Sequence, residues 1–116
     1  MIRILGCVIV VICLSLGYGW VKDGEGADPA KGKALYEERC MLCHGPKGDG
    51  KGPGAVALDP KPANYTQKKF WEQENIEKII PETIKNGKGQ MRASPDLTPD
   101  DVESIILYIK QTFKPK

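Results

Sequence analysis

The chain has 116 residues, of which 28% are charged, and its formal net charge is only +2. A chain of this length supports one small domain at most, and its near balance of acids and bases gives no basis for nucleic-acid binding. Because a small domain buries only a modest part of its surface, we expect an internal cross-link or a cofactor to stabilise it.

The N-terminal segment has the layout of a secretory signal. Arg3 precedes an uncharged, mostly apolar run over residues 4–21, and small residues near the end of that run favour cleavage after Gly19. The run also approaches the ~17–25 residues that span a bilayer, so an uncleaved membrane anchor is the alternative. We expect the protein to be exported, to the periplasm or another compartment outside the cytoplasm. The chain divides into a signal peptide or anchor at 1–19, a linker at 20–27 and one domain at 28–116.

The first predicted helix follows the linker. Asp28 is a suitable N-cap, Pro29 suits the first helical position, and the helix should run to about Cys40. Gly32 and Tyr36 lie one turn apart on this helix and share a face. Another helix can therefore approach closely at the glycine.

The middle of the chain combines a long loop with a second helix. Residues 45–62 are rich in Gly, Pro, Lys and Asp, which predicts a loop that needs something to fold around. Residues 75–86 then predict a helix, which Pro81 should kink or interrupt before two glycines end it. The apolar face of this helix consists of Ile76, Ile79, Ile80 and Ile84.

The last helix has the clearest signals. Thr98 is its N-cap, Pro99 its first helical residue and Asp101 an acid in its first turn, and Lys110 near its end complements the helix dipole. No strand pattern and no internal repeat is visible, so the predicted fold class is all-α. The amphipathic stripe of this helix consists of Val102, Ile105, Ile106 and Ile109.

A Cys-x-x-Cys-His motif, formed by Cys40, Cys43 and His44, indicates covalent attachment of a c-type haem. Two thiols can add to the two vinyl groups of haem, and the following imidazole can bind the iron. The rival interpretations are weaker. Zinc usually takes four protein ligands, and with Cys7 and Cys13 in the leader only three remain. A thioredoxin-type dithiol would need a βαβ context, and a simple disulfide leaves the histidine unexplained.

The sixth position of the iron needs a second ligand. His44 is the only histidine, which excludes bis-histidine ligation within one chain. Met1 is in the leader and Met41 lies between the two attached cysteines, so Met91 is the candidate. A methionine ligand opposite histidine raises the reduction potential, which suits a redox carrier. The alternatives are that Met91 only fills the core, that Lys88 is the ligand, or that the sixth position is open.

From about Asp28 to Phe113 the chain resembles the class I, monohaem c-type cytochromes. That resemblance implies a small cytochrome c fold, in which the N- and C-terminal helices cross and a middle helix and long loops wrap one haem c, bound covalently through two cysteines. The residues that carry the resemblance are Gly32, Tyr36, Cys40, Cys43, His44, Gly45, Gly48, Gly50, Gly52, Pro53, Met91 and Tyr108.

The resemblance also implies roles for residues around the cofactor. The carbonyl of Pro53 would accept a hydrogen bond from the His44 ring, which fixes the orientation of the imidazole. Tyr65 and Trp71 would donate hydrogen bonds to a haem propionate, or would only be core aromatics with a solvated polar tip. The two helical residues Gly32 and Tyr36 would pack against the last helix near its tyrosine.

These features together predict a one-electron carrier rather than an enzyme, because no proton-donor constellation, second metal site or substrate pocket is visible beyond the haem. A haem-based ligand sensor and a fixed subunit of a larger membrane oxidoreductase are the alternatives. We expect a monomer whose redox partners have acidic docking surfaces, with membrane contact only if the N-terminal segment is retained. The basic residues that would steer such partners, or form an ordinary solvated surface, are Lys47, Lys51, Lys61, Lys68, Lys69, Lys85, Lys88 and Arg92.

Overall fold

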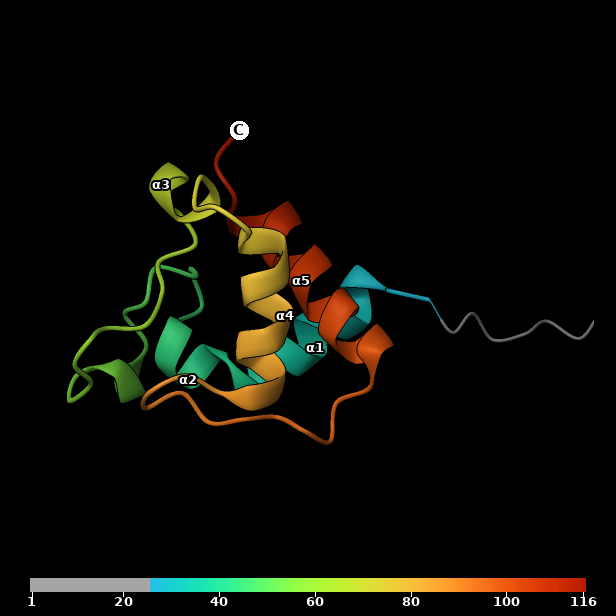
Figure 1. Ribbon diagram of the computed structural model, residues 1–116. Coiled ribbons are helices and arrows are strands. Elements are labelled where there is room, and N and C mark those ends of the chain that lie inside the picture. The colour runs from blue at the N-terminus through green and yellow to red at the C-terminus, as the bar shows by residue number, and fades with distance from the viewer. Residues whose placement is uncertain (1–25) are drawn as a thin grey trace, which may run out of the picture.

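The computed structural model describes residues 26–116, in which short helices are joined by long loops (Figure 1). Within these residues the only β-type pairing is one isolated bridge between Lys88 and Met91, so the all-α prediction is confirmed. The predicted leader and most of the linker lie outside the described residues. No helix in the described part is long and apolar enough to cross a membrane. The elements are α1 (Pro29–Arg39), α2 (Met41–His44), the 3₁₀ turn η1 (Pro53–Ala55), α3 (Lys68–Trp71), α4 (Ile76–Asn86) and α5 (Pro99–Phe113).

The hydrophobic core lies where α5 packs against both α1 and α4 (Figure 1). Burial of these apolar side chains is the main force that holds helices of this length together, because short helices are marginal on their own. The aromatic residues near the loops extend the same core toward the predicted site. The buried side chains are Tyr36, Tyr65, Trp71, Ile76, Ile80, Ile84, Leu97, Val102, Ile105, Ile106 and Ile109.

Helix α1 begins as the sequence predicts. The Asp28 carboxylate accepts a hydrogen bond from the amide of Ala30 at 2.9 Å, and Pro29 occupies the first helical position. The backbone amide of Asp28 also donates to the hydroxyl of Ser104 in α5 at 2.9 Å. The start of the first helix is therefore fixed both by its own cap and by the last helix.

The crossing of α1 and α5 depends on Gly32. This residue is buried, and a Cβ atom added to it would collide with the carbonyl group of Ser104. One turn further, the ring of Tyr36 lies 5.4 Å from the ring of Tyr108 and 5.4 Å from that of Phe113, centroid to centroid. The predicted approach of the terminal helices at the glycine is confirmed.

Replacing Gly32 with alanine should destabilise the fold by about 2 kcal/mol or more. Alanine gains roughly 1 kcal/mol over glycine in a helix. The new methyl group meets backbone that cannot move aside, so the cost of overpacking lies at or above the upper end of its usual range, about 3 kcal/mol, and the net loss is about 2 kcal/mol or more. Urea unfolding measures the difference. Gly26→Ala is the control, because nothing lies within 4 Å of a Cβ at that position. Equal midpoints for both variants would show that the helices are not in close contact here.

Of the two effects predicted for Pro81, a kink or an interruption of α4, the structure excludes the interruption. The helix continues from Ile76 to Asn86 with the proline inside it, so the expected interruption does not occur. Proline removes one backbone donor, whereas the isoleucines on the buried face pack into the core along the whole helix. Packing therefore outweighs the loss of one helical hydrogen bond. Asn75 precedes the helix in the left-handed conformation, with φ of 61°.

Helix α5 starts with the predicted cap, reinforced by a residue from α1. The hydroxyl of Thr98 accepts from the amide of Asp101 at 3.2 Å, and the Asp101 carboxylate accepts from the amide of Thr98 at 2.9 Å. Lys31 of α1 forms an ion pair with the same carboxylate. The Lys31 ammonium and then the Thr98 groups lower the pKa of Asp101 to about 2.

The lowered pKa of Asp101 predicts a pH-dependent contribution to stability. Because the folded pKa lies below the ordinary value of about 3.9, the contribution is fully present above pH 4 and is lost as the pH falls through about 2. Asp101→Asn should therefore unfold more easily than the original protein at pH 7. The two should converge as the pH falls from about 4 to about 2. Unfolding midpoints across this range give the test, and a difference that stays constant would contradict it.

Candidate functional site

The predicted attachment residues lie on one helical turn. Cys40 separates α1 from α2, and the amide of His44 donates to the carbonyl of Cys40 at 2.9 Å, so Cys40, Cys43 and His44 project from one side of that turn. Both thiols are partly buried and free, so they do not form the disulfide considered above. Burial raises the pKa of Cys40 to about 11, which keeps that sulfur protonated at neutral pH.

The zinc interpretation finds no support in the described part of the chain. Residues 26–116 contain no group of three or more His, Cys, Asp or Glu side chains that could hold a metal ion. The two cysteines and the histidine are neighbours on a helical turn, but no fourth side chain of these types completes a tetrahedral set.

The imidazole of His44 is buried, and one of its two nitrogens forms a hydrogen bond with the backbone. Its Nδ1 lies 3.3 Å from the carbonyl oxygen of Ala63. The other nitrogen, Nε2, has no hydrogen-bond partner among residues 26–116 and is not sealed from solvent. Burial lowers the pKa of His44, against a smaller opposite effect of the Ala63 carbonyl. At neutral pH the ring is therefore neutral, with Nδ1–H donating to the carbonyl and a lone pair available on Nε2.

The carbonyl group that accepts the hydrogen bond from the His44 ring differs from the one that the resemblance implies. The structure places Ala63 at Nδ1, whereas Pro53 begins the short turn η1. The reason is the path of the loop, because the amide of Tyr65 donates to the carbonyl of Gly48 at 2.7 Å. This bond places the segment 62–65 over the end of α2, so that the Ala63 carbonyl lies next to the imidazole.

Glycines after His44 let the loop wrap closely around α2. The amide of Gly50 donates to the carbonyl of His44 at 2.9 Å, and the amide of Gly52 donates to that of Cys43 at 3.0 Å. A Cβ on Gly52 would collide with the carbonyl of Leu42. The loop thus satisfies the last carbonyls of α2, which a helix end otherwise leaves unpaired.

An aromatic cluster covers one side of His44. The Tyr65 ring stacks on the imidazole at a centroid distance of 5.0 Å and an interplanar angle of 16°. Phe70 packs on the edge of Tyr65 at 5.1 Å, and the indole N–H of Trp71 donates to the Tyr65 carbonyl at 2.8 Å. The single N–H group of Trp71 is therefore already paired with a backbone carbonyl, whereas the Tyr65 hydroxyl has no partner among residues 26–116. Sequence reasoning missed this stacking.

Met91 lies in the loop between α4 and α5. Its backbone pairs with that of Lys88 through two hydrogen bonds of 3.0 and 3.1 Å, which form a tight turn. Its side chain is partly buried against the hydrophobic core. The side-chain carbonyl of Gln90 accepts from the amide of Asp59 at 3.1 Å, so the turn is tied to the loop that leaves η1. Met91 thus belongs to a different segment from the attachment motif.

A bidentate ion pair links those two segments. Arg39, directly before Cys40, donates from both terminal nitrogens to the two carboxylate oxygens of Asp96 at 2.9 and 2.7 Å. This is the geometry in which an exposed pair contributes most. The pair joins the end of α1 to the segment that follows Met91. The sequence carries no signal for it, because the partners are 57 residues apart.

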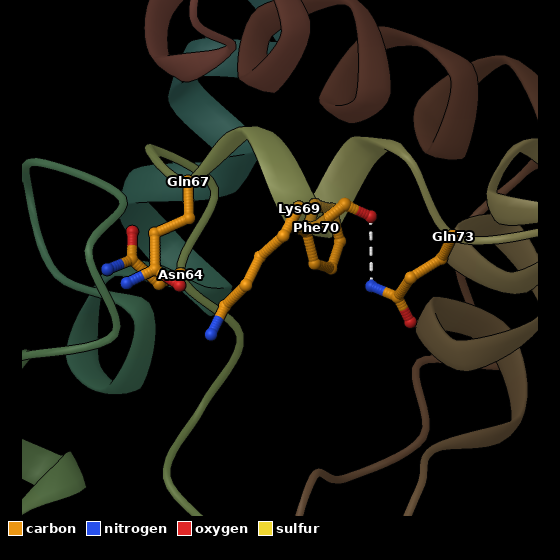
Figure 2. Close-up of a pocket in the computed structure, with 5 residues that line it drawn as sticks. All are labelled: Asn64, Gln67, Lys69, Phe70 and Gln73. Atoms are coloured by element: carbon orange, nitrogen blue, oxygen red, sulfur yellow. Dashed lines mark hydrogen bonds between the residues drawn. The ribbon is translucent and has the colours of Figure 1, made fainter.

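A pocket lies beside the aromatic cluster, under α3 (Figure 2). It measures about 330 Å³, and none of the four predicted site residues lines it. It adjoins the site indirectly, because Asn64 follows Ala63 and Phe70 packs on Tyr65. Gln73 donates to the Phe70 carbonyl at 2.9 Å. The lining residues are Asn64, Gln67, Lys69, Phe70 and Gln73.

A comparison with protein-family models matches residues 29–113 to cytochrome c. The chain belongs to the cytochrome c family. A comparison with curated proteins found no matching relative. Cytochrome c proteins bind haem c covalently through cysteine, and this cytochrome has Cys40 and Cys43 at the required spacing.

The residues present fit that cofactor. Two free thiols on one turn can form two thioethers, and a neutral imidazole anchored through Nδ1 presents Nε2 to a metal. The carbonyl at Nδ1 fixes the tautomer, which is the usual arrangement behind a metal-binding histidine. Cys40, Cys43 and His44 therefore fit the covalent attachment and one iron ligand of haem c.

Proposed function

We propose that this cytochrome is an exported one-electron carrier that holds a single haem c through Cys40 and Cys43, with His44 and Met91 as iron ligands. The observation that carries the proposal is the pairing of two free thiols with a buried, neutral imidazole on one helical turn. A dithiol enzyme would not need the histidine. A structural metal site would need further ligands.

Bound haem supplies a reversible one-electron couple at its iron. The chain's own residues would set the conditions for that couple. The Ala63 carbonyl holds the His44 ring in one tautomer and increases its basicity, and a thioether from Met91 would favour the reduced state. The loop around α2 and the aromatic cluster exclude water from one side of the imidazole, because His44 and Tyr65 are both buried.

The charge distribution supports a docking role for the loops. The segments 45–62 and 85–94 are tied together by the hydrogen bond between Asp59 and Gln90. They carry six cationic residues and two acids, so the two segments together have an excess of four positive charges. Such a surface would attract a redox partner with an acidic docking face and bind it more weakly in high salt. The cations are Lys47, Lys51, Lys61, Lys85, Lys88 and Arg92.

The absorption spectrum and the reduction potential of the purified full-length protein test the proposal. We expect a c-type spectrum and one reversible one-electron transition, with no binding of carbon monoxide by the reduced protein. Colourless protein would rule out the cofactor. Ready binding of carbon monoxide would instead favour the ligand-sensor alternative, and N-terminal sequencing after export would show whether cleavage follows Gly19.

A further inference from the structure

The ring of Tyr65 lies flat against the imidazole of His44. The two ring centroids are 5.0 Å apart, the ring planes differ by only 16°, and both side chains are buried. Every other aromatic pair in residues 26–116 is tilted or edge-on, with an interplanar angle of 45° or more. Offset stacking is one of the favoured geometries of aromatic pairs. The single flat pair in the described part of the chain therefore involves the predicted iron ligand.

The hydrogen bond of His44 restrains its ring only weakly. Its Nδ1 lies 3.3 Å from the carbonyl oxygen of Ala63, whereas N–H···O bonds are commonly about 2.9–3.0 Å long. The torsion that turns a histidine ring about its Cβ–Cγ bond has a broad range. A long bond at one nitrogen thus defines the tautomer but permits several ring orientations. A neighbouring ring that lies flat on the imidazole narrows this range, because turning the imidazole would push its edge into that ring.

Tyr65 is itself firmly anchored. Its backbone amide donates to the carbonyl of Gly48 at 2.7 Å, and its carbonyl accepts from the indole N–H of Trp71 at 2.8 Å. The ring of Phe70 packs edge-on against the Tyr65 ring at a centroid distance of 5.1 Å. Both the backbone and the ring of Tyr65 are thus held by contacts that do not involve His44. A side chain that orients a ligand needs support of this kind.

We propose that Tyr65 is a positioning residue for His44, whose imidazole it holds in one rotational orientation through the stacked ring. The inference rests on the proposed function, in which His44 binds the haem iron. A ligand imidazole interacts with iron through the π orbital perpendicular to its plane, so the orientation of that plane affects the magnetic properties of the oxidised iron. The role belongs to the aromatic ring of Tyr65, and the hydroxyl group is not needed for it.

Three variants separate the ring of Tyr65 from its hydroxyl group and from the rest of the aromatic cluster. Tyr65→Leu removes the flat ring, and Tyr65→Phe keeps the ring without the hydroxyl group. Phe70→Leu is the matched control, because it removes a ring that contacts Tyr65 edge-on. Each full-length variant is purified with its haem and normalised by haem absorbance. The absorption spectrum reports the identity of the iron ligands, and the electron paramagnetic resonance spectrum of the oxidised protein reports the orientation of the imidazole.

We expect the same absorption spectrum for the original protein and all three variants, because no iron ligand is replaced. The paramagnetic resonance signals of the original protein, Tyr65→Phe and Phe70→Leu should coincide, whereas those of Tyr65→Leu should shift and broaden. An aromatic pair favours its aligned geometry by a factor of roughly 2 to 10, so the other ring orientations should become more populated by about that factor.

Three outcomes of this experiment would overturn the inference. Equal resonance signals in Tyr65→Leu and the original protein would show that the stacked ring does not hold the imidazole. The same change in Tyr65→Phe as in Tyr65→Leu would assign the effect to the hydroxyl group. The same change in Phe70→Leu would assign it to a general loosening of the aromatic cluster.

A measurement on the original protein keeps the test decisive if Tyr65→Leu does not fold or does not bind haem. In the reduced protein, whose six-coordinate iron is diamagnetic, nuclear magnetic resonance should show Overhauser effects between the ring protons of Tyr65 and those of His44. Their absence would overturn the inference. Original protein that contains no haem would instead remove the proposed function itself, so the two failures are distinguishable.

Discussion

Replacing both Cys40 and Cys43 with alanine should leave a protein whose haem is completely removed by acidic organic solvent, whereas the original protein should retain all of its pigment. The reason is that the two thioethers are the only covalent links available, since both sulfurs are free and no other cysteine lies in residues 26–116. Each single variant keeps one link and should retain the pigment. The absorbance of the solvent extract and of the precipitated protein measures how much haem is released and how much stays bound to the protein.

A change between the two cysteines provides the control for this experiment. Leu42→Ala removes an exposed side chain from the same turn and leaves both sulfurs in place, so its pigment should stay with the protein. Pigment that is extracted from the original protein as easily as from the double variant would show that the cofactor is not covalently bound. Identical loss from Leu42→Ala would show that the treatment, and not the missing thiols, releases it.

Met91→Ala should lower the reduction potential by an amount on the order of 0.1 V or more and allow the reduced protein to bind carbon monoxide. Axial ligands shift haem potentials over a range of roughly 0.8 V, and loss of a thioether opposite histidine moves the potential downward. The side chain is only partly buried, so its removal should change ligation much more than stability. Redox titration and carbon monoxide difference spectra report the two effects.

Two variants distinguish ligation by Met91 from the alternatives. Met41→Leu changes the other methionine of the described residues, and it should leave the spectrum unchanged. Lys88→Gln tests the lysine alternative, because its loss should have no effect if the sulfur is the ligand. An unchanged spectrum and potential in Met91→Ala would contradict ligation by this residue and leave the sixth position open.

The helices that the sequence predicts best are those with signals inside the element. Asp28 and Pro29 start α1, and Thr98 and Asp101 cap α5, because each cap depends on residues at most three positions away. The attachment motif is equally local, since its three residues occupy a single turn. The family relationship also follows from it, and the comparison over residues 29–113 confirms that relationship.

Features that depend on distant residues could not be read from the sequence. The partner of the His44 ring is Ala63 because the loop folds back over α2, and no local pattern carries that path. Pro81 predicts a kink or an interruption of α4, and only the packing of the finished core shows why the helix is not interrupted. The short elements η1 and α3 span too few residues for hydrophobic periodicity to appear.

The contact of Tyr36 with Phe113 gives the end of the chain a role in the surroundings of the site. The Tyr36 hydroxyl donates to the carbonyl of Gly45, the residue after His44, at 2.7 Å, and the Phe113 ring lies against both Tyr36 and Gly48. The last residue of α5 therefore braces the loop that encloses the imidazole. Removal of the final turn of α5 would take away this contact, even though Phe113 lies far from His44 in sequence.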